Sequence, residues 1–166
     1  METISKTLFD ITEIHGWKLA NRLVVAPMTR VSATDAGVPT QDMADYYEAC
    51  AAGGFGMIIT EGTYTDNLFS KSNHNQPGIA DAAQMNGWKR VVQAVHKHNT
   101  RIISQLMHGG ALSAALDETI APSAVQPIGM RTTDISVPPS PFPLPRAIQA
   151  EDFAAIKAGF VHAALL

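Results

Sequence analysis

The chain repeats one pattern three times, a short apolar run that leads into polar residues or glycine, and this repeat constrains the fold most strongly. The apolar runs are Leu23–Ala26, Met57–Thr60 and Arg101–Met107. Such runs are typical of strands that are covered on both faces in parallel sheets. Because segments with helical spacing follow them, the sequence predicts βαβ units, and hence a parallel sheet or a (β/α) barrel. A Rossmann fold has less support, since no G-x-G-x-x-G motif follows any of the runs.

Side-chain spacing and capping residues predict three helices. The first follows Thr40 as its N-cap and ends at Gly53-Gly54. The second follows Asp81 and ends near Lys97. The third is predicted from an apolar face that continues to Leu166. That face consists of Phe153, Ile156, Phe160, Val161, Ala164 and Leu165.

Two further segments complete the predicted organisation. Residues Leu8–Ala20 contain two strand-like pieces around His15-Gly16, which predicts a hairpin that could close one end of a barrel. Residues 111–149, after the third strand, form a proline-rich excursion that is too long for an ordinary connection. Loops of this length are usually functional or mobile.

The composition excludes several classes of protein. With 46% hydrophobic and 16% charged residues, the chain has the balance of one globular domain. A formal net charge of -3 without a basic cluster argues against nucleic-acid and membrane partners. The single Cys50 excludes an internal disulfide, and His96 and His98 do not share a helix face, so no metal site is expected. Because Met1–Asp10 lacks the apolar core of a signal peptide, we expect a cytoplasmic protein.

Polar residues at the strand ends are the candidates for a ligand site. Pro27 stops the first strand, and Met28, Thr29 and Arg30 follow it. Ligands of parallel α/β folds bind at this carboxyl end of the strands. Gln105 interrupts the third apolar run, and a buried amide there must find hydrogen-bond partners. His108 ends the third strand, where a ligand contact and a structural hydrogen bond are equally compatible with its position.

Several short motifs together give the chain a family resemblance. In order they are Asn21-Arg22, Ala26-Pro27-Met28-Thr29-Arg30, Glu61-Gly62-Thr63, Pro77-Gly78-Ile79, Gly87-Trp88, Gln105-Leu106 with His108, Ala121-Pro122-Ser123 and Pro145-Arg146-Ala147. With this order and spacing, the chain resembles the amino-terminal half of the old yellow enzyme family of FMN-dependent ene-reductases. The resemblance implies a (β/α)8 TIM barrel, of which residues 1–166 supply the hairpin and about the first three β/α units of a single flavin domain.

The resemblance also implies a cofactor site and a reaction. Ala26, Pro27, Met28 and Thr29 would line the FMN ring, with Thr29 near its C4 carbonyl, where the hydroxyl would tune the reduction potential. Gly62 would lie beside the ring, and Gln105 would pair with its pyrimidine edge, while Arg30 would belong to the same neighbourhood. Family members transfer hydride from NADPH through FMN to the activated C=C bond of an enone, maleimide or nitroalkene.

Two departures from the family pattern qualify this expectation. Ala111 stands where family members often have an arginine, and the His/Asn pair that grips the substrate carbonyl follows a fourth strand, beyond Leu166. We therefore expect a complementary barrel half, or association with a second copy, to cover the exposed strands. The alternatives are a non-catalytic half-barrel that complements another chain and, with least support, a flavin-free barrel enzyme such as an aldolase. An aldolase would need a lysine at a strand end, and none is present there.

Overall fold

A computed structural model describes residues 7–132 and 136–166 of the chain. Part of the amino-terminal segment considered for a signal peptide lies outside the described residues. The elements are β1 (Thr12–Ile14), β2 (Trp17–Leu19), β3 (Val24–Val25), α1 (Gln41–Ala52), β4 (Met57–Tyr64), α2 (Ala82–His96), β5 (Arg101–Met107), the 3-10 turn η1 (Gly110–Leu112), β6 (Ile120–Ala121), β7 (Met130–Arg131), β8 (Ser140–Pro141), β9 (Arg146–Ala147) and α3 (Ala150–Leu165). The predicted alternation of strands and helices is confirmed.

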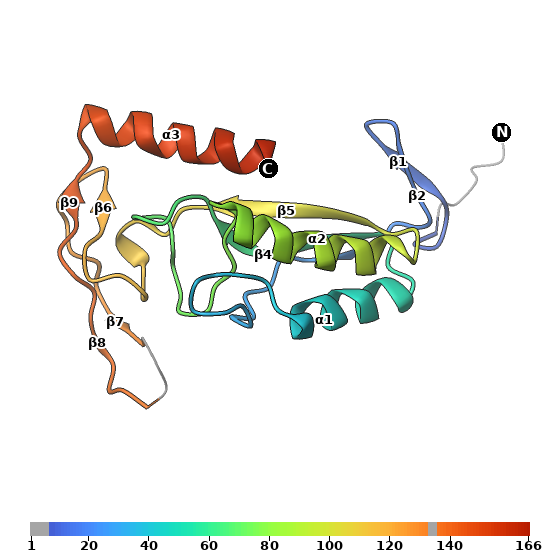
Figure 1. The fold of residues 1–166 in the computed structure, drawn as a ribbon, viewed down its shortest axis with the longest axis horizontal. Helices are drawn as coiled ribbons and strands as arrows, with labels where there is room; N and C mark the ends of the chain where they lie inside the picture. The colour runs from blue at the N-terminus through green and yellow to red at the C-terminus, as the bar shows by residue number, and fades with distance from the viewer. Residues whose placement is uncertain (1–6, 133–135) are drawn as a thin grey trace.

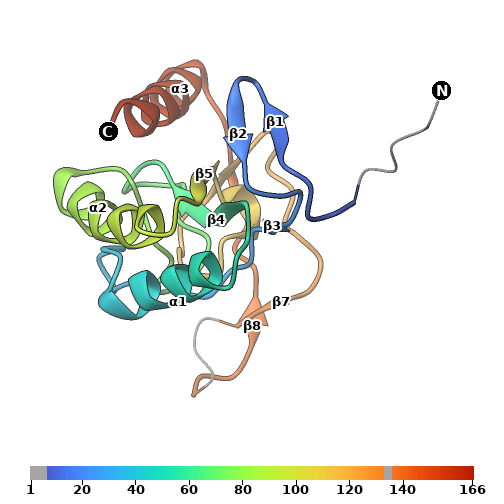
Figure 2. The same cartoon turned by 90° about the vertical axis from the view of Figure 1, so that its right-hand side faces the viewer.

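Strands β3, β4 and β5 form one parallel sheet in that order, and α1 and α2 connect them (Figure 1). Both helices lie on the same face of the sheet (Figure 2). The buried core between them is built from Val25, Ala33, Met43, Ala44, Tyr47, Ala51, Ile58, Trp88, Val91, Ala94 and Val95. Burial of these apolar side chains is what holds the two helices against the strands.

The opposite face of the sheet, which we call the inner face, is open in the described residues. Val24 is 36% exposed and Ile103 37% exposed, and Gln105 is also exposed. The prediction that the first strand is covered on both faces is therefore not met within residues 7–132 and 136–166. In the same residues, β3 and β5 each pair along one edge only. In a closed barrel, further strands would cover this face and these edges.

The helix caps agree with the sequence prediction. Thr40 Oγ1 accepts a hydrogen bond from Met43 N at 3.4 Å, and α1 ends at Gly53. Asp81 Oδ1 accepts from Gln84 N at 2.9 Å, which caps α2. Each cap satisfies a helical N–H that has no partner within its own helix.

Strand β4 is longer than predicted. It continues through Glu61-Gly62-Thr63 to Tyr64, so the prediction that these polar residues lie beyond the strand is wrong. The polar groups are tolerated because they find partners inside the protein: Gln76 Nε2 donates to Gly62 O at 2.7 Å. Two residues, Thr60 and Glu61, lie between the pairs Ile59↔Ile103 and Gly62↔Gln105, which forms a β-bulge. Gln105 N donates to Thr60 Oγ1 at 3.1 Å, so the bulge keeps this donor satisfied.

Asn21 joins the beginnings of two strands. Its Oδ1 accepts from Leu23 N at 2.9 Å and from Gly56 N at 3.0 Å, and its Nδ2 donates to Gly54 O at 2.7 Å. The residue is buried. One side chain thus fixes the entry to β3 against the loop that leads into β4.

The predicted hairpin is confirmed, with β1 and β2 antiparallel and turning at His15-Gly16. The Arg101 guanidinium lies 5.7 Å from the centre of the Trp17 ring, which places the hairpin beside the amino end of β5. This is the end of the sheet opposite the predicted ligand site.

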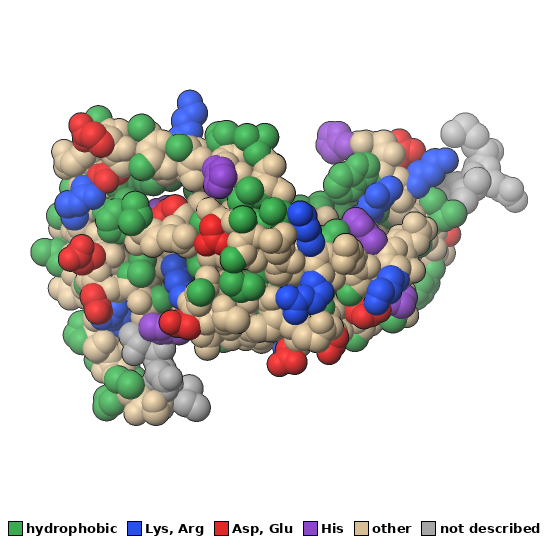
Figure 3. All heavy atoms as spheres, in the orientation of Figure 1, with side chains coloured by type: hydrophobic (Ala, Val, Ile, Leu, Met, Phe, Trp, Pro, Cys, Tyr) green, Lys and Arg blue, Asp and Glu red, His purple; other side chains and the backbone are tan. Residues whose placement is uncertain are grey.

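Helix α3 follows the 111–149 excursion, which the described residues show to contain η1 and several two-residue strands. Of the residues that the structure describes in α3, Ala163 is the only buried one, while Phe153, Val161 and Leu165 are exposed. Figure 3 shows the surface hollowed between α3 and the hairpin, with hydrophobic side chains on both sides. Of the helices in the described residues, none is both long and apolar enough to span a bilayer.

Candidate functional site

The sheet brings most of the predicted site residues to one place. Gly62 of β4 pairs directly with Gln105 of β5. Ala26–Thr29 follow β3, which pairs with β4, and lead to Arg30, whose N–H binds Glu61 of β4. Ile102 packs against the helix-covered core, so Gln105 and Met107, at alternate positions, face the inner side. The predicted site is therefore a patch at the carboxyl end of the three strands.

The polar groups of this patch are available to a ligand. Ala26, Pro27, Met28 and Thr29 are exposed, and so is Gln105. Among the described residues, neither the Thr29 hydroxyl nor the Gln105 side-chain amide has a hydrogen-bond partner. An amide offers both a donor and an acceptor, which suits a ring edge that carries N–H and C=O groups, as the FMN pyrimidine does. The residues present thus fit a flavin.

Gly62 lies where a side chain would not fit. A Cβ at this position would overlap the Met107 Sδ atom and come 3.6 Å from Gln105 Oε1. Met107 is a flexible thioether side chain that shares the inner face with Gln105. Gly62 is itself buried, because the Met107 side chain covers the place that a Cβ would take.

A buried carboxylate, which the sequence did not single out as a site residue, anchors the chain just after Thr29. Glu61 is 1% exposed, and its Oε2 accepts from Arg30 N at 2.9 Å and from Val31 N at 3.1 Å. Tyr47 OH lies 3.5 Å from the other carboxylate oxygen and accepts from Glu61 N at 2.9 Å. Burial raises the pKa of Glu61, and the two backbone donors of Arg30 and Val31 act in the opposite direction.

Arg30 turns away from the patch. Its guanidinium lies 4.0 Å from the centre of the Tyr46 ring in α1, a cation–π arrangement. Its backbone N–H binds Glu61, as described above. In the structure, Arg30 thus serves to fasten the chain to α1 and β4.

His108 lies apart from the other predicted site residues. With Asp66, Phe69 and Ile156, among others, it lines a separate cavity of about 160 Å³ beneath α3. Its Nδ1 accepts from Gly110 N at 3.0 Å, so a neutral ring carries its proton on Nε2, which is 4.0 Å from Asp66 Oδ2. Burial lowers the pKa of His108, which favours this neutral form.

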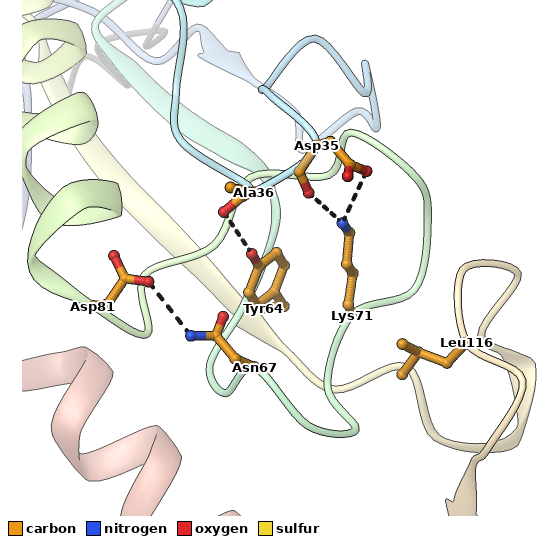
Figure 4. Close-up of a pocket in the computed structure, with 7 residues that line it drawn as sticks. All are labelled: Asp35, Ala36, Tyr64, Asn67, Lys71, Asp81 and Leu116. Carbon is orange, nitrogen blue, oxygen red and sulfur yellow. Dashed lines mark hydrogen bonds and ion pairs between the residues drawn. The ribbon is translucent and has the colours of Figure 1, made fainter.

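A second cavity, of about 400 Å³, lies beside the end of β4 (Figure 4). It is lined by Asp35, Ala36, Tyr64, Asn67, Lys71, Asp81 and Leu116. Lys71 Nζ donates to Asp35 O at 2.7 Å, and Tyr64 OH donates to Ala36 O at 3.2 Å. These bonds fasten the loop before α1 to the end of β4, so the polar groups of this cavity are largely used within the chain.

We expect Tyr64→Phe to destabilise the fold by about 1 kcal/mol at neutral pH, because Gln84 Nε2 donates to Tyr64 OH at 2.6 Å and would lose this acceptor. Burial raises the pKa of Tyr64 from 10.0 to about 12. A raised pKa in the folded state stabilises it below pH 10, and this contribution disappears as the pH rises towards 12. Urea denaturation across this interval should show a smaller alkaline loss in the variant than in the parent. Equal losses would mean that Tyr64 does not titrate in this way.

Comparisons with known proteins place the chain among flavin oxidoreductases. Residues 7–166 match the model of the NADH:flavin oxidoreductase / NADH oxidase family. A probable flavin mononucleotide-dependent alkene reductase of Leishmania infantum is 35% identical over 149 residues, covering 85% of this chain and 40% of the relative. The chanoclavine-I aldehyde reductase of Penicillium roqueforti is 32% identical over 160 residues, covering 95% of this chain and 41% of the relative.

Solved structures show the same fold. An old yellow enzyme homologue from Zymomonas mobilis superposes with a TM-score of 0.84 and 31% identity, covering 95% of this chain and 44% of that structure. Morphinone reductase in complex with tetrahydroNAD gives the same TM-score and identity over 96% of this chain and 46% of its own. The chain spans about two fifths of the length of these curated relatives and less than half of the solved structures. It has the fold of the amino-terminal part of a TIM barrel and belongs to the NADH:flavin oxidoreductase / NADH oxidase family, with old yellow enzymes as its structural neighbours.

Proposed function

We propose that this chain forms one side of the FMN site of an ene-reductase, which uses NADPH to reduce the activated C=C bond of α,β-unsaturated carbonyl or nitro compounds. The observation that carries the proposal is the pair Gly62 and Gln105 at the carboxyl end of a parallel sheet, with the exposed segment that ends in Thr29 tied to the same strand through Arg30 N and Glu61. Bound FMN would supply the hydride chemistry, accepting a hydride from the nicotinamide and delivering it to the alkene.

Each residue of the patch would have a distinct task. Gln105 would hold the pyrimidine edge of the ring with its free amide. Gly62, with no side chain of its own, would allow the ring to approach β4 at the place where the flexible Met107 side chain packs. Ala26 and Pro27 would support the ring by contact, and Met28 would add a soft apolar surface. Thr29 would place a hydroxyl donor near the C4 carbonyl oxygen.

Completing this site requires further structure over the inner face. The exposed Val24 and Ile103 and the unpaired edges of β3 and β5 need a cover, which a complementary barrel half would provide. The carbonyl-binding residues would come from that half. The rival proposal, a non-catalytic half-barrel that assembles with another chain, rests on the same open face but predicts no flavin turnover.

The two proposals separate in an anaerobic test of the half-reactions. The complete protein, meaning this chain with the residues that close its barrel, is expected to bind FMN that NADPH reduces and an enone or a maleimide reoxidises. A saturated ketone should not reoxidise the flavin, because it has no C=C bond to accept the hydride. A flavin that NADPH reduces and no activated alkene reoxidises would refute the substrate class, and no reduction by NADPH would refute the proposed nicotinamide.

Thr29→Ala should lower the midpoint potential of the bound flavin. A hydroxyl donor near an oxygen that gains negative charge on reduction stabilises the reduced form, and its removal costs about 1 kcal/mol, or roughly 20 mV for two electrons. The potential can be measured by dye-coupled reduction of the parent and the variant. Thr34→Ala, which changes another exposed threonine outside the patch, is the control and should leave the potential unchanged. If the midpoint potential of Thr29→Ala equals that of the control, the Thr29 hydroxyl does not contact the flavin.

A further inference from the structure

Glu61 occupies an unusual position for a carboxylate. It lies within β4 and is 1% exposed, and burial of a charged group is costly unless hydrogen bonds compensate. The compensation here comes from the main chain after Thr29, since Arg30 N and Val31 N both donate to the single atom Oε2. Tyr47 OH holds the other side of the same residue. The carboxylate is therefore a fixed acceptor aimed at residues 30 and 31.

The backbone that donates to this carboxylate is strained at Val31. Val31 has a φ of +51°, a left-handed conformation that is rare for a β-branched residue. Val31 is 41% exposed, so packing offers little compensation. The left-handed turn points two consecutive N–H groups towards one oxygen, and these two bonds to Glu61 are what offset the strain.

The turn sets the course of the Ala26–Thr29 segment, because Thr29 immediately precedes the two anchored residues. β3 itself ends at Val25, so this exposed segment is fixed by the strand at one end and by the Glu61 contacts at the other. We propose that Glu61 is a positioning residue for flavin binding: by holding Val31 in its left-handed conformation it presents Thr29 and its neighbours to the ring. This inference rests on the proposed FMN site.

The test compares five variants with the parent protein. Glu61→Met removes the acceptor while keeping a side chain of similar size, and Glu61→Gln returns an uncharged acceptor. Val31→Gly removes the penalty for a positive φ. It is made both as a single variant and combined with Glu61→Met. Gln84→Met is the matched control, because Gln84 is also 1% exposed and its amide makes several bonds, but these fasten Ala36 and Tyr64 rather than the Ala26–Thr29 segment.

Three measurements are made on each protein: hydrogen exchange of the amides of residues 30 and 31, the dissociation constant for FMN, and the midpoint potential of bound flavin. Glu61→Met should lose protection of both amides and bind FMN at least about tenfold more weakly, with a lowered potential, since two donors lose a charged acceptor. Glu61→Gln should fall between this variant and the parent. Adding Val31→Gly to Glu61→Met should restore part of the FMN affinity, because glycine holds the turn without strain. Gln84→Met should lower stability and leave the two amides and the potential unchanged.

Specific results would overturn the inference. Parent-like exchange and FMN binding in Glu61→Met would do so, and so would a shift of the potential in Gln84→Met equal to that in Glu61→Met. A double variant that binds FMN no better than Glu61→Met would refute the role of strain at Val31. Hydrogen exchange of the amides of residues 30 and 31 is measured without flavin. It therefore shows whether Glu61 anchors the turn even if the parent protein binds no FMN. That last result would refute the proposed function instead.

Discussion

Gln105→Leu is expected to weaken FMN binding by about 1 to 3 kcal/mol, or roughly 5- to 150-fold in the dissociation constant, because polar groups on the ring edge would lose their partners. Gln105 is exposed and its side chain has no partner among the described residues, so its loss should leave the fold intact. Its backbone N–H would still donate to Thr60 Oγ1. Quenching of flavin fluorescence during titration measures the dissociation constant directly.

Gln93→Leu provides the matched control for this prediction. Gln93 is an exposed residue of α2, on the other side of the molecule from the inner face, and it undergoes the same chemical change. FMN affinity should be unaffected by it. Equal dissociation constants for the parent, Gln105→Leu and Gln93→Leu would show that Gln105 does not bind the cofactor.

Asn21→Ala is expected to lower the free energy of unfolding by about 2 to 4 kcal/mol, since two backbone donors and one backbone acceptor lose their partner in a buried place. Asn21→Asp should cost less, because it keeps the oxygen that accepts from Leu23 N and Gly56 N. Chemical denaturation can be followed by the fluorescence of Trp88, which is 5% exposed and packs in the helix-covered core.

The control for this second prediction is Asn86→Ala. Asn86 is an exposed residue of α2, and alanine has the higher helix propensity, so this variant should match the parent or be slightly more stable. A loss for Asn21→Ala no larger than the change for Asn86→Ala would contradict the role assigned to Asn21. If Asn21→Ala proves less stable than Asn21→Asp, the difference measures the two bonds that the side-chain oxygen accepts from Leu23 N and Gly56 N.

Local signals in the sequence predicted the frame of the structure well. Thr40 and Asp81 cap α1 and α2, and the apolar run Arg101–Met107 is strand β5 with the predicted bounds. These features depend on residues a few positions apart. The family resemblance is confirmed by the match over residues 7–166, and with it the partial TIM barrel.

The parts that sequence reasoning missed depend on partners far away in the chain. Strand β4 reaches Tyr64 because the polar groups near Glu61 are satisfied by Tyr47 and by Gln76, at separations that no short motif reveals. The contacts of Glu61 could not be predicted for the same reason. The one local indication is that a carboxylate directly follows an apolar run, Met57–Thr60. The predicted apolar face of α3 is largely exposed in the described residues, where little of the chain covers it.

The assignments of residues to the FMN site remain predictions. The predicted residues do not all lie in one place in the structure. Gln105 and Gly62 are paired across β4 and β5, and Thr29 lies on the adjoining segment, so these residues share one patch. His108 follows Gln105 closely in sequence, yet it lines a different cavity with residues of α3. His108 lies one residue beyond the end of β5, where the chain leaves the sheet and turns towards Gly110, so its distance in sequence from Gln105 did not predict its position.

Whether this chain supplies part of an FMN site can be decided from the visible absorption spectrum of the natively purified protein, taken before and after reconstitution with FMN. We expect a yellow protein whose flavin spectrum remains after desalting and is weakened in Gln105→Leu. A folded protein that stays colourless after FMN has been added and unbound flavin removed would contradict it.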